Sequence, residues 1–136
     1  MIFIDRSIPR SVADALKAIG RDDVIWLEDK YPRATKDRDW LPDAGANGWL
    51  VITRDKRIRT RPKERDAVIQ NSVGLFVFVQ GENPTKWDYF KLLGKCLDQM
   101  EQLFLSTPRP FIYVIDKAGS IRRYYPPSGG ASQPGD

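Results

Sequence analysis

Residues 49–56 read Trp-Leu-Val-Ile-Thr-Arg-Asp-Lys, an apolar run that ends in polar and charged side chains. A similar run opens the chain, where residues 2–4 (Ile-Phe-Ile) are followed by Asp5. Such runs are typical of short strands buried on both faces of a parallel sheet. Ligands of open α/β sheets bind outside the carboxyl ends of the strands, so we expect Asp5 and Asp55 to meet at one edge. Two carboxylates that meet repel each other unless a cation lies between them, and their oxygens suit Mg²⁺ or Mn²⁺.

Strands and helices alternate in the pattern of the remaining chain. Further strands are predicted at residues 24–27, 49–53, 74–79 and 111–115, and helices at residues 8–19, 40–47, 62–70 and 86–105. Ser7 is expected to cap the first helix and Thr85, with Asp88, the last. Residues 117–120 predict a turn and residues 121–125 a returning strand, so the segment before them is a last parallel strand or the first arm of a hairpin. This order predicts a three-layer α/β/α sandwich with a mainly parallel sheet and a C-terminal hairpin or extra strand.

One domain is expected over residues 1–125, because 136 residues are too few for two ordinary domains. Residues 126–136 are rich in Pro, Gly and Ser and predict a disordered tail. The first residues form a strand instead of a signal peptide, and no apolar run reaches transmembrane length. We therefore expect a cytoplasmic protein with no membrane partner.

The composition narrows the chemistry. The chain has no histidine and one cysteine, Cys96. This excludes histidine general acid–base catalysis, Ser-His-Asp triads, the usual zinc sites and internal disulfides. Carboxylates, hydroxyls, Lys, Arg and a bound cation remain. The formal net charge of +4 favours a polyanionic partner.

Two further acids are predicted at the same edge of the sheet. Glu28 follows the strand at residues 24–27, and Asp39 stands where a helix begins after a long polar stretch. An aspartate in such places is also a common turn former or helix cap, so Asp39 could instead be the N-cap before Trp40.

A dense basic run follows Asp55. Seven cations lie between positions 54 and 65, and they are Arg54, Lys56, Arg57, Arg59, Arg61, Lys63 and Arg65. Such a run neutralises nucleic-acid phosphates, although many charge runs are only solvated surface. Its start at the predicted acidic edge favours a nucleic-acid-binding function.

The chain resembles PIN-like ribonuclease domains, in particular the branch with VapC-type toxins and Mut7-C-like domains. The resemblance rests on residues 3–9 (Phe-Ile-Asp-Arg-Ser-Ile-Pro), on residues 39–41 (Asp-Trp-Leu) and most specifically on residues 51–56 (Val-Ile-Thr-Arg-Asp-Lys), and it covers residues 1 to about 80. It implies a Mg²⁺ or Mn²⁺ site built from Asp5, Asp39 and Asp55, with Thr53 as a supporting hydroxyl. The family often adds another catalytic acid. Strand order selects Glu28 for it, with Asp37 and Asp43 as substitutes.

The resemblance further implies an endoribonuclease that hydrolyses RNA phosphodiester bonds, as the toxin of a toxin–antitoxin pair. Its partners would then be RNA, a cognate antitoxin and a second copy in a homodimer. Two alternatives stay open. One is a non-catalytic RNA- or protein-binding module of the same fold. The other is a receiver-like phosphoacceptor domain, in which Asp5, Asp55 and Lys117 would form the acceptor site.

Overall fold

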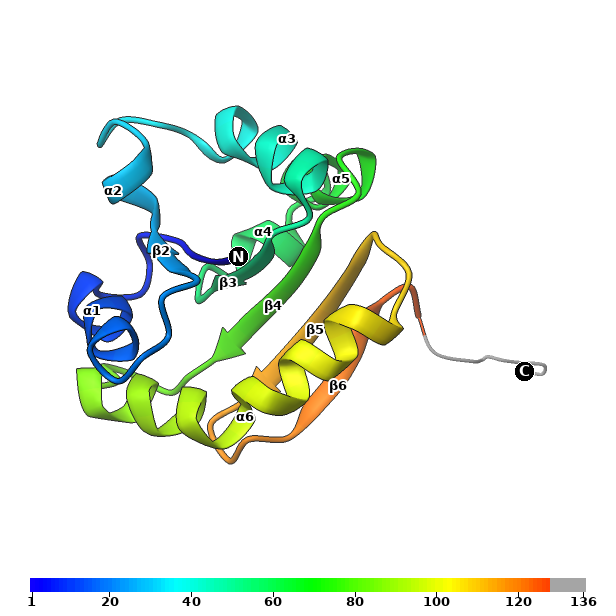
Figure 1. Ribbon diagram of the computed structural model, residues 1–136. Coiled ribbons are helices and arrows are strands. Elements are labelled where there is room, and N and C mark those ends of the chain that lie inside the picture. The colour runs from blue at the N-terminus through cyan, green and yellow to red at the C-terminus, as the bar shows by residue number, and fades with distance from the viewer. Residues whose placement is uncertain (128–136) are drawn as a thin grey trace.

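The computed structural model describes residues 1–127, and a six-stranded sheet with the order β2-β1-β3-β4-β5-β6 runs through its centre (Figure 1). The strands are β1 (Ile2–Ile4), β2 (Val24–Trp26), β3 (Leu50–Thr53), β4 (Gly74–Val79), β5 (Phe111–Asp116) and β6 (Ile121–Tyr125). The first five strands are parallel, and β6 pairs antiparallel with β5. The predicted parallel α/β sheet with a C-terminal hairpin is confirmed, and β5 is both the last parallel strand and the first arm of that hairpin.

Helices cover the sheet on both sides (Figure 1). Helices α1 (Arg10–Ala18) and α6 (Lys86–Ser106) pack on one face. The other face is covered by α2 (Leu27–Lys30), α3 (Asp37–Asn47), α4 (Arg57–Thr60) and α5 (Pro62–Gln70). The result is the predicted three-layer sandwich.

Side chains of each central strand alternate between two hydrophobic cores. In β1, Ile2 and Ile4 face α1 and α6, whereas Phe3 packs against Trp40 of α3 with ring centroids 4.9 Å apart. In a strand, successive side chains point to opposite faces. Because both faces of this sheet are covered, every residue of β1 and β3 is buried. That is why these strands are uniformly apolar until they reach the edge.

Two predicted helix starts were wrong. The first helix begins at Arg10 with Pro9 as N-cap and no side-chain cap, so Ser7 does not cap it. The hydroxyl of Ser7 instead bonds near the end of β3. Helix α3 begins at Asp37, before the predicted start at Trp40, because the backbone N–H of Lys36 donates to Asp39 in a capping box.

Strand register aligns the carboxyl ends of the strands. Ile4 pairs with Ile52 across β1 and β3, and Phe78 pairs with Ile115 across β4 and β5. The residues that follow these strands therefore lie along one edge of the sheet. Of the predicted tail, residues 128–136 lie outside the described part of the chain. No helix within residues 1–127 is long and apolar enough to cross a membrane.

Candidate active site

Asp5 is a buried carboxylate directly after β1, with 4% of its surface exposed. The backbone N–H of Ser7 donates to one carboxylate oxygen, and the Thr53 hydroxyl donates to the other. Burial raises the pKa of Asp5, and the bonds from Ser7 and Thr53 oppose this rise only in part. Because burial disfavours the charged form of Asp5, a cation beside it would stabilise the carboxylate.

Ser7 and Thr53 connect the ends of β1 and β3. Their hydroxyl oxygens lie 3.2 Å apart, and the Arg54 N–H donates to Ser7 Oγ over 2.8 Å. The Asp55 N–H donates to Thr53 Oγ1 over 3.0 Å. This network fixes the loop that carries Asp55 relative to Asp5. The role of Ser7 was missed from sequence, although a hydroxyl two residues after a strand-end acid is a usable signal.

Asp55 is half-buried and paired with Arg57. The guanidinium of Arg57 donates from Nε to Asp55 Oδ1 over 2.9 Å and from Nη2 to Oδ2 over 2.7 Å. This pairing lowers the pKa of Asp55 and keeps it ionised. The negative charge of Asp55 in turn raises the pKa of Asp5.

Asp37, the first residue of α3, is the third acid that interacts with this pair. Burial is the main cause that raises its pKa to about 6, followed by the charges of Asp5 and Asp55. The nearby Trp40 indole N–H lowers the pKa of Asp37, but within residues 1–127 Trp40 Nε1 has no partner in hydrogen-bonding geometry. Asp5, Asp37 and Asp55 thus lie together in one cleft of about 570 Å³, which we call the acidic cleft. Its lining also includes Glu64 and the cations Arg6, Lys36, Arg38, Arg57 and Lys63.

The other predicted acids lie elsewhere. Asp39 is exposed, and its carboxylate accepts the Lys36 N–H at the start of α3. Glu28 accepts from Arg6 Nε over 3.1 Å. Asp43 accepts the Tyr31 hydroxyl. None of these three lines the acidic cleft within the described residues, so of the acids named from sequence the structure brings together Asp5, Asp55 and the substitute Asp37.

Comparison with protein-family models matches residues 1–80 to the model described as a PIN like domain, more than half of the chain. The chain belongs to the PIN-like domain family. Searches of curated proteins and of solved structures give no match. PIN-like domains are generally nucleases, so the match indicates a nuclease-type fold and favours it over a receiver-like domain. The matched segment includes Asp5, Asp37 and Asp55 of the acidic cleft.

A divalent cation fits this PIN-like domain by the chemistry of its donors. The cleft offers hard carboxylate oxygens, and the pKa values of Asp5 and Asp37 are raised chiefly by burial and further by neighbouring carboxylates, so a cation would stabilise their charged forms. Within residues 1–127, however, no three acids are arranged closely enough to form a ready metal cage. In the structure, Arg57 donates to both oxygens of Asp55. A cation would need Arg57 to release that carboxylate.

The basic run of the PIN-like domain divides between two cavities. Lys63 and Arg57 line the acidic cleft. Beside it, Arg54, Lys56 and Arg59 line a second cavity of about 620 Å³, the basic groove. Arg59 also lies over the ring of Tyr124 at 5.2 Å from its centroid. Arg61 and Arg65 line neither cavity within the described residues, so five of the seven cations of the run line one cavity or the other.

Proposed function

We propose that this PIN-like domain is a Mg²⁺- or Mn²⁺-dependent ribonuclease that acts at the acidic cleft. One observation carries the proposal. Asp5, Asp37 and Asp55 come from three separate places in the chain to one cleft, where burial and mutual repulsion raise the pKa values of Asp5 and Asp37. Such an arrangement costs stability and is typical of functional sites.

The three carboxylates would hold the cation. When bound, the cation would polarise the scissile phosphate and lower the pKa of an attacking water, which is chemistry that needs no histidine. Thr53 and Ser7 orient Asp5 and leave fewer of its lone pairs free, so they act as positioning residues. Lys63, at the same cleft, supplies a cation for the substrate phosphate.

Asp37 takes the place that the resemblance gave to Asp39. Both residues lie in the first turn of α3, but the Asp39 carboxylate caps the helix while the pKa of Asp37 responds to Asp5 and Asp55. Glu28 is proposed to support the site indirectly, without lining the acidic cleft. It holds Arg6, whose Nη2 donates to the carbonyl oxygens of Arg33 and Thr35 and so fixes the loop before α3.

RNA as the substrate follows from the resemblance and from the basic groove beside the cleft. A toxin role, with an antitoxin that covers the cleft and a homodimer of the toxin, is proposed on the resemblance alone. Membership of the VapC-type or Mut7-C-like branch is likewise proposed on the resemblance alone.

One observation favours a second candidate, a non-catalytic RNA-binding module. Arg57 already neutralises Asp55, so the pair could serve as a structural contact in place of a metal ligand. In that case RNA affinity would not depend on divalent cations.

Cleavage of a labelled total-RNA pool by the purified chain tests the proposal. The reaction is run with Mg²⁺ or Mn²⁺, with chelator, and with Asp55→Asn. Asp43→Asn is the matched control, because Asp43 is an exposed aspartate outside the cleft. We expect metal-dependent cuts that Asp55→Asn abolishes and Asp43→Asn retains.

Binding of Mn²⁺ separates the two candidates. Loss of Mn²⁺ binding in Asp55→Asn, measured by calorimetry, supports the nuclease. The RNA-binding module replaces the nuclease proposal if the folded wild-type protein neither binds Mn²⁺ nor cuts RNA. In that case its RNA affinity should be the same with and without chelator.

A further inference from the structure

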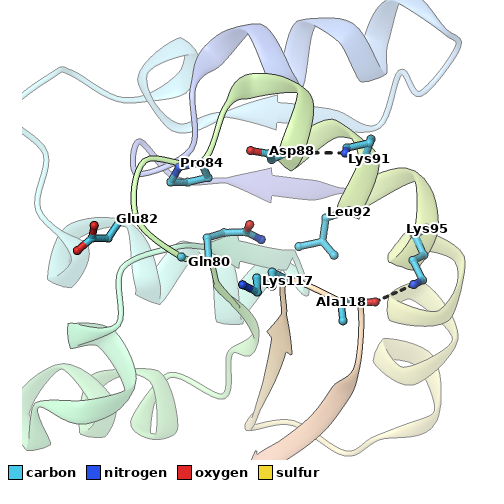
Figure 2. Close-up of a pocket in the computed structure, with 10 residues that line it drawn as sticks. Gln80, Glu82, Pro84, Asp88, Lys91, Leu92, Lys95, Lys117 and Ala118 are labelled. Atoms are coloured by element: carbon cyan, nitrogen blue, oxygen red, sulfur yellow. Dashed lines mark hydrogen bonds and ion pairs between the residues drawn. The ribbon is translucent and has the colours of Figure 1, made fainter.

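A third cavity lies on the same edge of the sheet, beyond the acidic cleft and the basic groove. Its volume is about 690 Å³, and Lys91, Lys95 and Lys117 line it. Figure 2 shows Lys91 and Lys95 on α6, with Lys117 on the turn after β5. We call this cavity the lysine pocket. Apart from Gln80, its lining residues lie beyond the segment that matches the family model, which ends at residue 80.

Only two of the three lysines of the pocket contact other polar groups of the protein. Lys95 donates to the carbonyl oxygen of Ala118 over 2.7 Å and supports the turn. Lys91 lies 3.9 Å from Asp88, a contact exposed to solvent and correspondingly weak. Lys117 makes no ion pair or side-chain hydrogen bond to the described residues. Lys91 and Lys117 are therefore available to an anion.

Two acids, Asp88 and Glu82, also line the pocket and leave one net positive charge beside its three lysines. Asp88 accepts the backbone N–H of Thr85 over 2.8 Å as part of the α6 capping box, so its carboxylate is committed to the helix start. Glu82 is exposed on the loop before α6, and its side chain points away from Lys91 and Lys95 in Figure 2.

The three cavities follow one another along the sheet edge. The basic groove shares Ser7, Asp55 and Arg57 with the acidic cleft. It also shares residues 80–82 with the lysine pocket. At this second junction, the amide nitrogen of Gln80 is buried and has no partner within residues 1–127. An unpaired buried donor thus lies where the two basic cavities meet.

We infer that the lysine pocket binds backbone phosphates of the RNA strand that leaves the acidic cleft through the basic groove. This inference rests on the proposed function. Strand order places β4 between β3 and β5, so the ends of β3 and β5 are about 10 Å apart, a span that a few nucleotides cover. Lysine ammonium groups bind phosphates as point charges, and Gln80 donates to a phosphate or base oxygen at the junction. The extra contacts give affinity to a strand longer than the cleft itself needs.

The test measures binding of a 5′-labelled single-stranded RNA of about 12 nucleotides by fluorescence anisotropy, in chelator, over a salt series. The variant is Lys91→Gln/Lys117→Gln, which leaves Lys95 and the turn it supports in place. The matched control is Lys17→Gln/Lys30→Gln, which removes the same charge and alters residues that line none of the three cavities.

We expect a 3- to 10-fold rise in Kd for the pocket variant and a change below twofold for the control. The slope of log affinity against log salt should fall by up to about 1.4, the value for two single-strand phosphate contacts. An equal loss in both variants would reduce the effect to net charge and overturn the inference. An unchanged Kd in the pocket variant would overturn it as well.

Cleavage kinetics separate this inference from the proposed function. If the wild-type chain cuts RNA, the pocket variant should show a raised KM and an unchanged kcat, because the lysines lie away from the carboxylates. If the chain cuts nothing and the pocket variant still binds RNA more weakly than the control, the phosphate site stands and the nuclease proposal fails. If cleavage depends on metal but KM is unaltered, the nuclease stands and the lysine pocket is not on the path.

Discussion

The acidic cleft and the lysine pocket lie on the same edge of the sheet and differ in the groups that they gather, three aspartates in the first and three lysines in the second. The acidic cleft is built at the ends of β1 and β3, where Asp5 and Asp55 follow the strands. The lysine pocket is built at the ends of β4 and β5, where Gln80 and Lys117 follow them. Both use the same geometric rule, in which parallel strands deliver their following residues to one place. The difference lies in what the covering helices bring to that place.

Burial separates the two regions further. Asp5 is buried, Asp37 and Asp55 are partly so, and mutual repulsion raises the pKa values of Asp5 and Asp37. The lysines of the pocket are exposed and remain close to solvent. Charges that are buried together need a cation to be stable, whereas exposed lysines can exchange solvent for phosphates at small cost. Burial therefore favours metal binding and catalysis in the acidic cleft, and exposure favours reversible phosphate binding in the lysine pocket.

The largest effect is expected when the two aspartates at the start of α3 are compared. Asp37→Asn removes the charge of one of the three aspartates of the acidic cleft and should lower the rate of RNA cleavage at least about 100-fold. Asp39→Asn removes only a capping interaction, so it should change cleavage less than about threefold and cost under about 1 kcal/mol of unfolding free energy. Cleavage of labelled RNA and thermal unfolding measure both. A larger loss of cleavage in Asp39→Asn than in Asp37→Asn would show that Asp39, and not Asp37, acts in the site.

The second prediction concerns pH and holds only for the acidic cleft. The pKa of Asp37 is raised from 3.8 to about 6, so between these pH values the folded protein binds the proton more tightly than the unfolded chain. Stability should therefore fall as pH rises from about 4 to 6. Because Asp37 is partly exposed, we expect its share to be on the order of 1 kcal/mol.

Urea unfolding in chelator measures this effect. Asp37→Asn should flatten the decline and make the metal-free protein more stable at pH 7. Lys91→Gln/Lys117→Gln should leave the pH profile of the wild-type protein unchanged. A wild-type profile that rises over this range would show that Asp37 does not carry uncompensated charge.

The smallest effect is expected at Arg57, which the acidic cleft shares with the basic groove. Arg57→Gln frees both oxygens of Asp55, so Mn²⁺ affinity should rise, by less than about fivefold because the ion pair is exposed. The same variant should weaken RNA binding, since it also removes a groove cation. Calorimetry with Mn²⁺ and anisotropy with RNA read these opposite changes. Weaker binding of both ligands would mean that Arg57 positions Asp55 for the metal.

The fold was largely predictable because its signals are local or periodic. Thr85 and Asp88 form the predicted capping box, and α6 ends within one residue of the predicted end. The short helices α2 and α4 were missed, since four residues give no period to detect. The start of α3 was placed too late because the carboxylate of Asp39 was assigned to the site, while in the structure it bonds the backbone before the helix.

The site was predictable only where strand ends define it. Asp5 and Asp55 follow uniformly apolar runs, and the parallel register delivers them to the same edge. Asp37 gives no comparable signal, because the loop that carries it is held by long-range bonds from Arg6.

The sequence by itself determined the parallel α/β sheet, the edge at which Asp5 and Asp55 meet and the absence of histidine, because composition and strand pattern are properties of the chain alone. The tertiary structure decided which first-turn acid of α3 enters the cleft, that Arg57 holds Asp55, and that Lys91 and Lys117 share a cavity. These depend on contacts between residues distant in the chain or on the direction of single side chains. Neither spacing nor charge encodes them, because only the packed sheet and helices fix those directions.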